Sequence, residues 1–227
     1  FDFIFDEGST LKPSFSTPNA QSMQTMFHAW TAAANCVSKY IFSIPEKYTR
    51  FSSSHYTMIN CFQFGGLTQH GEMAGNISAD INGMGGAARA DRDGEHSPAP
   101  FFATMADIGE QELIEEELPF MQLISRKITR DNQSFGKYRG GMGYQMAVAV
   151  HNSPAFGFMT TAQGAKVPNT HGLFGGYACP TYPLCRISGV DVFESFKTDP
   201  DKFKYSIEEL MNEQPFENAT YTTGPMA

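Results

Sequence analysis

The 227-residue chain has a formal net charge of -8 at pH 7, and hydrophobic residues make up 41% of it. This length and composition allow a buried core and exclude a disordered or collagen-like protein. The sequence holds no apolar run near the roughly 18 residues of a membrane-spanning helix and no block of basic residues. We therefore expect neither a membrane nor nucleic acid as a partner.

The glycine, proline and phenylalanine content indicates the fold class. The chain has 21 Gly, 13 Pro and 20 Phe residues, which is typical of many turns joining short aromatic strands. We predict a β-rich α+β fold with short twisted strands, long Gly-rich loops, one long N-terminal amphipathic helix and a short C-terminal helix. Only 4 cysteines are present, which favours free thiols and a cytoplasmic protein.

The N-terminal segment contains the clearest helical pattern. Alternation over residues 1–5 predicts a short strand before a turn. Thr17 suits the N-cap of a helix that begins at Pro18 and ends near Pro45. Apolar residues recur along it at helical spacing, namely Met23, Met26, Phe27, Trp30, Ala34, Val37 and Ile41. Core packing explains this stripe without a cofactor.

Strands and loops are expected over the middle of the chain. Alternation predicts a strand over residues 56–64, whereas residues 65–94 have no period and are expected to form one long irregular region. Further strands are predicted at residues 120–124, at Tyr144–Val150 and at Phe156–Thr160.

The C-terminal residues 200–227 are polar. Ser206 and Glu209 have the spacing of a capping box, which predicts one short helix there. We accordingly divide the chain into a main domain over residues 1–195 and a polar C-terminal extension over residues 196–227.

The first candidate site is the glycine-rich run 82–89 with the charged residues after it. It lacks the flanking strand and helix of a dinucleotide fingerprint, and no other common catalytic motif occurs in the chain. Its spacing favours a tight multi-turn loop shaped by Gly83, Gly85 and Gly86. Arg89, Asp93 and His96 then either position a carboxylate or phosphate group or form a salt-linked surface loop.

The second candidate site is the run 137–143. Lys137 and Arg139 precede Gly140 and Gly141, which allow close approach of a backbone or an anion. A hairpin turn flanked by exposed cations is the simpler interpretation. The six histidines show no metal-ligand spacing, so we assign no metal site to this chain.

These runs together resemble the hydantoinase B/oxoprolinase family. Residues 82–89, the following Asp93 and Gly94, and the acidic stretch with Glu112 and Glu116 look like the second half of the hydantoinase B-type subunit. The most specific element is residues 131–143, which are similar to the family run D-x-x-G-x-G-x-x-R-G-G-x-G.

Two further details refine the resemblance. Ser134 stands where glycine is usual in the family run. Residues 171–177 read H-G-L-F-G-G-Y and resemble the H-G-x-F-G-G-Y of the acetone and acetophenone carboxylase branch. The resemblance covers roughly residues 1–188.

The family subunit is several-fold longer than this chain, so the resemblance implies the C-terminal portion of a hydantoinase B-like large subunit. It implies two polypeptide partners, a hydantoinase A-like ATPase subunit and the N-terminal half of the same subunit. ATP and Mg²⁺ are then expected on the partner subunit, and Mn²⁺ or Zn²⁺ on the N-terminal half. This chain alone is expected to bind no cofactor.

The resemblance also implies a function, an ATP-dependent ketone carboxylase that joins a bicarbonate-derived carboxyl group to an activated ketone. Substrate or intermediates are expected to contact Arg89, Asp93, His96, Lys137, Arg139 and His171. The loops are expected to be shaped by Gly83, Gly85, Gly86, Gly140, Gly141, Gly175 and Gly176.

The residues that would carry out the chemistry stay unassigned, and two other functions stay open. One is a cyclic amide hydrolase of the hydantoinase or oxoprolinase type, against which the run 171–177 argues. The other is a structural subunit fragment with no reacting residue.

Overall fold

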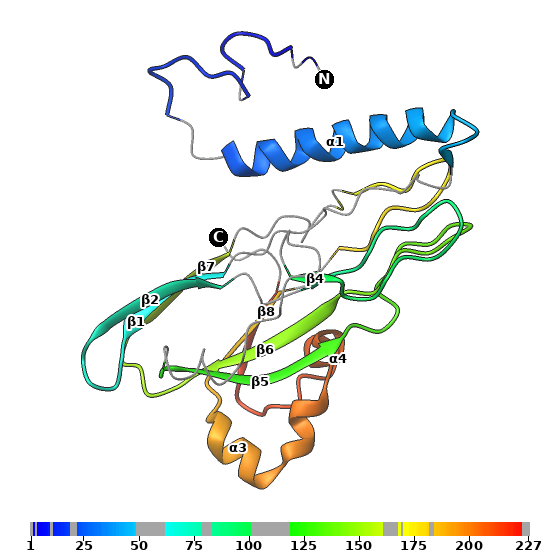
Figure 1. Cartoon of the computed structure of the whole chain (residues 1–227). Helices are drawn as coiled ribbons and strands as arrows, with labels where there is room; N and C mark the ends of the chain where they lie inside the picture. The colour runs from blue at the N-terminus through cyan, green and yellow to red at the C-terminus, as the bar shows by residue number, and fades with distance from the viewer. Residues whose placement is uncertain are drawn as a thin grey trace.

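The structure is a computed structural model that describes residues 2, 4–9, 11–18, 22–48, 62–78, 83–100, 119–160, 168, 170–181 and 184–223. These residues form helices and antiparallel sheets (Figure 1), which confirms the α+β class. The predicted acidic stretch before Pro119 lies outside the described residues, as does Asn82.

The first sheet has three strands in the order β2-β1-β7, formed by β1 (Phe62–Leu67), β2 (Met73–Ser78) and β7 (Phe156–Thr160). The expectation of one irregular region over residues 65–94 is wrong here, because β1 and β2 form an antiparallel hairpin. The turn is closed by a bond from the Thr68 N–H to the Glu72 carbonyl (2.8 Å) and by Gly71 at φ +80°. Gly66 has no room for a side chain, since a Cβ there would lie 2.2 Å from the Ala155 carbonyl oxygen.

The second sheet has four strands in the order β4-β3-β6-β5, formed by β3 (Gly83–Met84), β4 (Ala99–Pro100), β5 (Met121–Ile128) and β6 (Tyr144–Val150). The predictions at Tyr144–Val150 and Phe156–Thr160 match β6 and β7, although these consecutive strands belong to different sheets. A Cβ on Gly83 would overlap the Tyr144 ring at 1.9 Å, so glycine lets β3 pair beside that aromatic residue.

The hydrophobic core joins these two sheets. Phe120 is 1% exposed and packs edge-on against Phe64 of β1 and Phe156 of β7, with ring centroids 6.2 and 5.6 Å apart. Met121 of β5 belongs to the same cluster, and Val148 of β6 packs against it. The core therefore fixes the sheets relative to one another by aromatic contacts.

Helix α1 (Ser22–Phe42) lies along one side of the molecule, apart from the sheets (Figure 1). Its described part runs from Ser22 and ends before Pro45, while Pro18 is not helical and residues 19–21 lie outside the described residues. The side chains of the predicted apolar stripe at Met23, Met26, Phe27 and Trp30 lie outside the described part, so the amphipathic character of α1 stays a prediction. Among residues 1–5, the described ones form no strand, and Ile4 is 91% exposed, so the strand predicted there is wrong for them.

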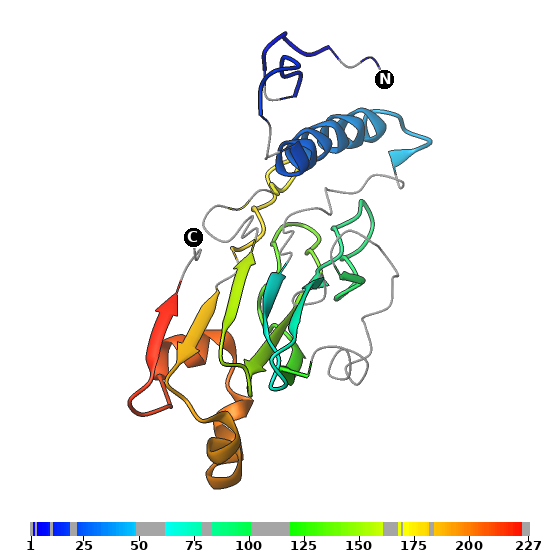
Figure 2. The same ribbon diagram turned by 90° about the vertical axis from the view of Figure 1, so that its left-hand side faces the viewer.

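The C-terminal segment folds back onto the body of the protein. It contains β8 (Cys185–Ser188), α3 (Val192–Thr198), the 3₁₀ helix η2 (Pro200–Lys204), α4 (Ile207–Glu213) and β9 (Thr220–Thr223). Strand β9 pairs antiparallel with β8, and both lie beside β7 (Figure 2), where the Arg186 guanidinium is 5.8 Å from the Phe158 ring centre. The capping box of Ser206 and Glu209 is present at the start of α4, as predicted.

A lysine ties this segment to the second sheet. Lys127 of β5 donates from Nζ to the carbonyl oxygens of Lys204 (2.6 Å) and Tyr205 (2.5 Å), and its partial burial lowers its pKa. The boundary expected between residues 195 and 196 falls inside α3, and the division into a main domain and an extension stays a prediction. Within the described residues, no helix is long and apolar enough to span a membrane.

Candidate functional site

The two glycine-rich runs pair with each other along their backbones. We call residues 85–97 and 131–143 the glycine loop pair. The Gly86 N–H donates to the Glu95 carbonyl (2.7 Å), and the Gly141 N–H donates to the Gly86 carbonyl (2.8 Å). The Gly94 N–H donates to the carbonyl of Arg139 at 2.8 Å. Residues 45 and 55 positions apart in the chain, Gly94 with Arg139 and Gly86 with Gly141, thus join the two loops into one unit.

Glycine is required in this pair because the backbones touch. A Cβ on Gly85 would lie 1.8 Å from the Gly141 carbonyl oxygen, and a Cβ on Gly141 would lie 1.8 Å from the Glu95 carbonyl oxygen. A Cβ on Gly94 would lie 2.1 Å from the Gly86 oxygen. The space beside Gly85 and Gly141 is filled by the opposite loop, and that beside Gly94 by Gly86 of the same loop. These glycines therefore let backbones approach closely instead of opening a cradle for an anion.

Ser134, the departure from the family run, fits the loop without backbone strain. Its φ is not positive, so the turn does not require glycine at that position. Its carbonyl accepts from the Gly140 N–H at 3.0 Å, and its Oγ lies 2.6 Å from the place that a Cβ on Gly140 would occupy. The serine hydroxyl therefore packs against the bare Cα of Gly140.

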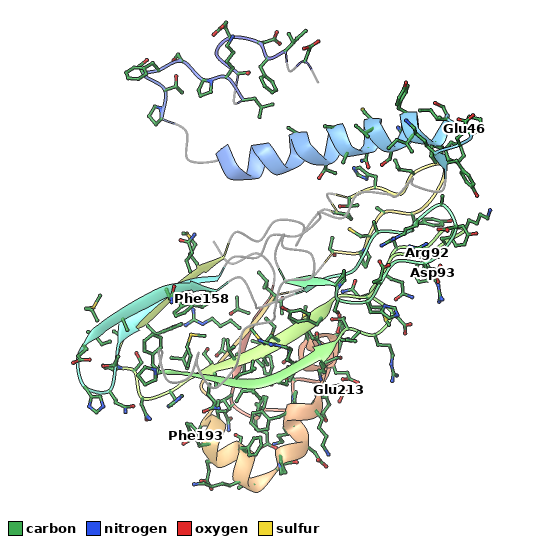
Figure 3. The ribbon with its side chains drawn as sticks, viewed as in Figure 1. Glu46, Arg92, Asp93, Phe158, Phe193 and Glu213 are labelled. Carbon is green, nitrogen blue, oxygen red and sulfur yellow. The ribbon has the colours of Figure 1, made fainter. Side chains whose placement is uncertain are left out.

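Asp93 and Arg139 form an ion pair with three contacts between the two loops. Asp93 accepts from the Arg139 backbone N–H (2.8 Å) through Oδ1, and from Nε (3.0 Å) and Nη2 (2.9 Å) through Oδ2. The backbone hydrogen bond from Arg139, followed by its side-chain hydrogen bond, lowers the pKa of Asp93. Figure 3 shows Arg92 and Asp93 on the side of the molecule where α1 ends near Glu46, far from Phe158.

This pKa shift predicts a pH dependence of stability. Because the unfolded chain binds the proton at the ordinary pKa of 3.8 and the folded chain only at a lower pH, stability falls as the pH drops through this range. From about pH 5 to about pH 3, the melting temperature of the unmodified protein should therefore fall more steeply than that of Asp93→Asn. If the melting temperatures of the two proteins fell by the same amount over this pH range, the ion pair would be contradicted.

Arg89 forms a second ion pair inside the same loop. Its Nη2 lies 2.9 Å from Glu95 Oε1, and the Arg89 N–H donates to the Arg92 carbonyl. The pKa of Glu95 is lowered, first by a hydrogen bond from its own backbone and further by the charge of Arg89. Both arginines that were predicted to bind anions are thus already opposed by carboxylates.

His96 is held by a backbone group of the opposite loop. Its Nδ1 accepts from the Met142 N–H at 2.9 Å, so the neutral ring carries its proton on Nε2. The residue is exposed, and the neighbouring Ser97 is bound to the Met142 carbonyl by its N–H (2.8 Å). The neutral His96 ring is thus held in one tautomer, and its Nε2–H is a hydrogen-bond donor at the edge of the loop pair.

Lys137 differs from both arginines. It is exposed, and its Nζ lies 5.3 Å from the centre of the neighbouring Tyr138 ring. Among the residues that the structure describes, no carboxylate forms an ion pair with it. Of the three predicted anion-binding cations, Lys137 therefore has the least competition from a carboxylate for an incoming anion.

The third run, residues 171–177, contacts the loop pair by its C-terminal end. The Tyr177 N–H donates to the Phe135 carbonyl at 2.8 Å, and the run turns at Phe174 and Gly175, which have φ values of +51° and +89°. The Gly176 N–H closes the turn on the Leu173 carbonyl. His171 is exposed, and no described hydrogen bond or ion pair links it to Asp93, His96 or Arg139.

Sequence reasoning grouped Glu95 with the charges of residues 89–96 without pairing it, and it missed the backbone partner of His96. Glu95 is the partner of Arg89, and the Met142 N–H fixes His96. The dense charge of residues 89–96 pointed to an ion-pair network but not to its pairing, and no sequence signal identifies a main-chain N–H as the partner of a histidine. Within the described residues, no group of three His, Cys, Asp or Glu side chains is placed to hold a metal.

Comparison with known proteins identifies the class. The family model described as Hydantoinase B/oxoprolinase matches residues 1–208. The chain belongs to this family, and its fold agrees with a solved nucleotide-free structure of acetone carboxylase at a TM-score of 0.75 and 22% identity. That match covers 92% of this chain and 27% of the solved chain.

Two curated relatives point to the carboxylase branch. The acetophenone carboxylase delta subunit of Aromatoleum aromaticum is 27% identical over 214 residues, which are 94% of this chain and 31% of the relative. The acetone carboxylase alpha subunit of Xanthobacter autotrophicus is 28% identical over 156 residues, 69% of this chain and 20% of the relative. The chain spans less than a third of the length of either relative.

Proposed function

We propose that this chain is part of an ATP-dependent ketone carboxylase complex of the acetone or acetophenone type. The observation that carries the proposal is the 27% identity to a carboxylase subunit over 94% of the chain. The same branch is supported by the acetone carboxylase subunit and by the fold. The reaction joins a carboxyl group derived from bicarbonate to a ketone that ATP has activated.

The loop pair would contribute an anion-binding edge to this reaction. The activated carboxyl group and the activated ketone are anionic intermediates that react with water, so they need donors in a protected chamber. Lys137 Nζ, His96 Nε2–H and the Nη1 of Arg139 are the donors that the described ion pairs leave available. Asp93 then acts as a positioning residue, because its carboxylate binds Nε and Nη2 of Arg139 and so fixes the guanidinium, while Nη1 stays available.

The cofactors and partners follow from the same assignment. A hydantoinase A-like ATPase subunit would bind ATP with Mg²⁺, and the N-terminal half of a hydantoinase B-type subunit would hold Mn²⁺ or Zn²⁺. The cytoplasm is the compartment that we propose, because Cys36 and Cys185 are free thiols. His171 and the glycines Gly175 and Gly176 would line the same chamber from the third run.

Lys137→Met in the assembled complex is the test of this edge. We expect kcat/KM for ketone carboxylation to fall about tenfold, because one charged donor to the anionic transition state is lost. Lys137→Arg should recover most of the activity, since arginine keeps the charge. Steady-state rates with acetone and with acetophenone give the measurement.

Lys197→Met is the matched control. Lys197 is also an exposed lysine, but it lies on α3 beside Glu194, away from the loop pair. If Lys137→Met and Lys197→Met had equal kcat/KM values for carboxylation, Lys137 would not be part of the anion-binding edge. Turnover of hydantoin or oxoproline in place of the ketones would instead favour the cyclic amide hydrolase.

A further inference from the structure

Five aromatic side chains gather where α1 ends beside the third run and the loop pair. We call Phe42, Tyr48, Phe135, Phe174 and Tyr177 the aromatic patch. Their exposed fractions are 43%, 38%, 51%, 57% and 74%. Exposed aromatic residues scattered singly need no explanation, whereas a contiguous group is typical of a binding surface.

Ring contacts connect Phe42, Tyr48 and Phe174, and a backbone hydrogen bond links Tyr177 to Phe135. The rings of Phe42 and Phe174 lie 4.3 Å apart between centroids, and Tyr48 meets Phe42 edge-on at 6.1 Å. The Tyr177 N–H bonds to the Phe135 carbonyl at 2.8 Å. The patch therefore spans three chain segments that are distant in sequence.

The backbone at Phe174 is strained. Its φ is +51°, a region that residues other than Gly, Asn and Asp rarely adopt, and a bulky residue there costs free energy. Asparagine or glycine would satisfy the same turn without that cost. The ring at this strained position packs on Phe42 and is still 57% exposed, so more than half of its surface is available to a partner.

We propose that the aromatic patch docks against the remainder of a hydantoinase B-type subunit, through an apolar surface on that remainder. This inference rests on the proposed function for its partner. The chain accounts for 31% and 20% of the curated relatives and 27% of the solved acetone carboxylase chain, so most of such a subunit lies outside these residues. Aromatic side chains are enriched in the buried centres of interfaces, and the patch adjoins the loop pair, so docking there would cover the proposed chamber.

Hydroxyl-radical footprinting of the assembled carboxylase complex tests this docking. Phe196 of α3 is the matched control, because it is a phenylalanine of similar exposure (52%) outside the patch. We expect Phe174 to be oxidised at least fivefold more slowly than Phe196 in the complex. Similar oxidation rates for the two residues would overturn the proposal.

A pair of substitutions supplies the second measurement. Phe174→Asn removes the ring but suits a positive φ, so the chain itself should keep or gain thermal stability. We expect it to weaken binding to the rest of the hydantoinase B-type subunit at least tenfold, while Phe196→Asn leaves that binding unchanged. Unchanged binding for Phe174→Asn, or self-association of the chain through the patch instead, would overturn the proposal. A complex that protects Phe174 but carboxylates no ketone would contradict only the proposed function.

Discussion

Replacing Gly141 with alanine is expected to destabilise the protein by about 3 kcal/mol, the upper part of the range for overpacking. The new Cβ would lie 1.8 Å from the Glu95 carbonyl oxygen and 2.9 Å from the Gly86 nitrogen. Both are backbone atoms, which cannot rotate away as a side chain would, so the two loops must separate. The hydrogen bond from the Gly141 N–H to the Gly86 carbonyl is then lost as well.

Urea unfolding of Gly141→Ala measures this loss. Gly157→Ala is the matched control, because a Cβ on Gly157 of β7 meets nothing within 4 Å and its φ is not positive. The control should be neutral or slightly stabilised, since alanine restricts the unfolded chain. A Gly141→Ala protein as stable as the control would show that the loops do not pack backbone to backbone.

Phe120→Ala is expected to cost about 3–5 kcal/mol, as large truncations of buried aromatic residues do. Phe120 is 1% exposed, and its ring contacts Phe64 and Phe156 of the first sheet. Because Phe120 immediately precedes β5, the cavity would open between the two sheets. Phe15→Ala is the control, since Phe15 is fully exposed and should leave the unfolding free energy unchanged.

Denaturant midpoints of the two phenylalanine variants give the comparison. An equally small loss for both would mean that Phe120 does not join the sheets.

The strands that the sequence predicts best are those with a side chain at nearly every position. β6 has no glycine and β7 has one, Gly157, and the predicted bounds of both strands match the structure. The β1–β2 hairpin was missed because Gly65, Gly66 and Gly75 interrupt it. Glycine contributes no side chain to a hydrophobic period, so pairing that depends on backbone contact leaves no alternation to detect.

The site was predictable in its composition but not in its pairing. The glycine runs and the charges beside them stand out in the sequence. Arg139 and Asp93, however, are brought together by a contact between residues 46 positions apart. This ion pair forms because the fold brings the two loops together. Arg139 was expected to be a cation that is free to bind an anion, whereas the structure has it already bound to a carboxylate. The consequence is that Lys137 becomes the first residue to test.

Isotopically labelled bicarbonate, followed in the assembled complex that contains this chain, gives the most direct test of the proposed carboxylation. We predict that the label enters a carboxylate product of acetone or acetophenone only when ATP is present. An assembled complex that hydrolyses ATP or a cyclic amide but leaves all of the label as bicarbonate would contradict it.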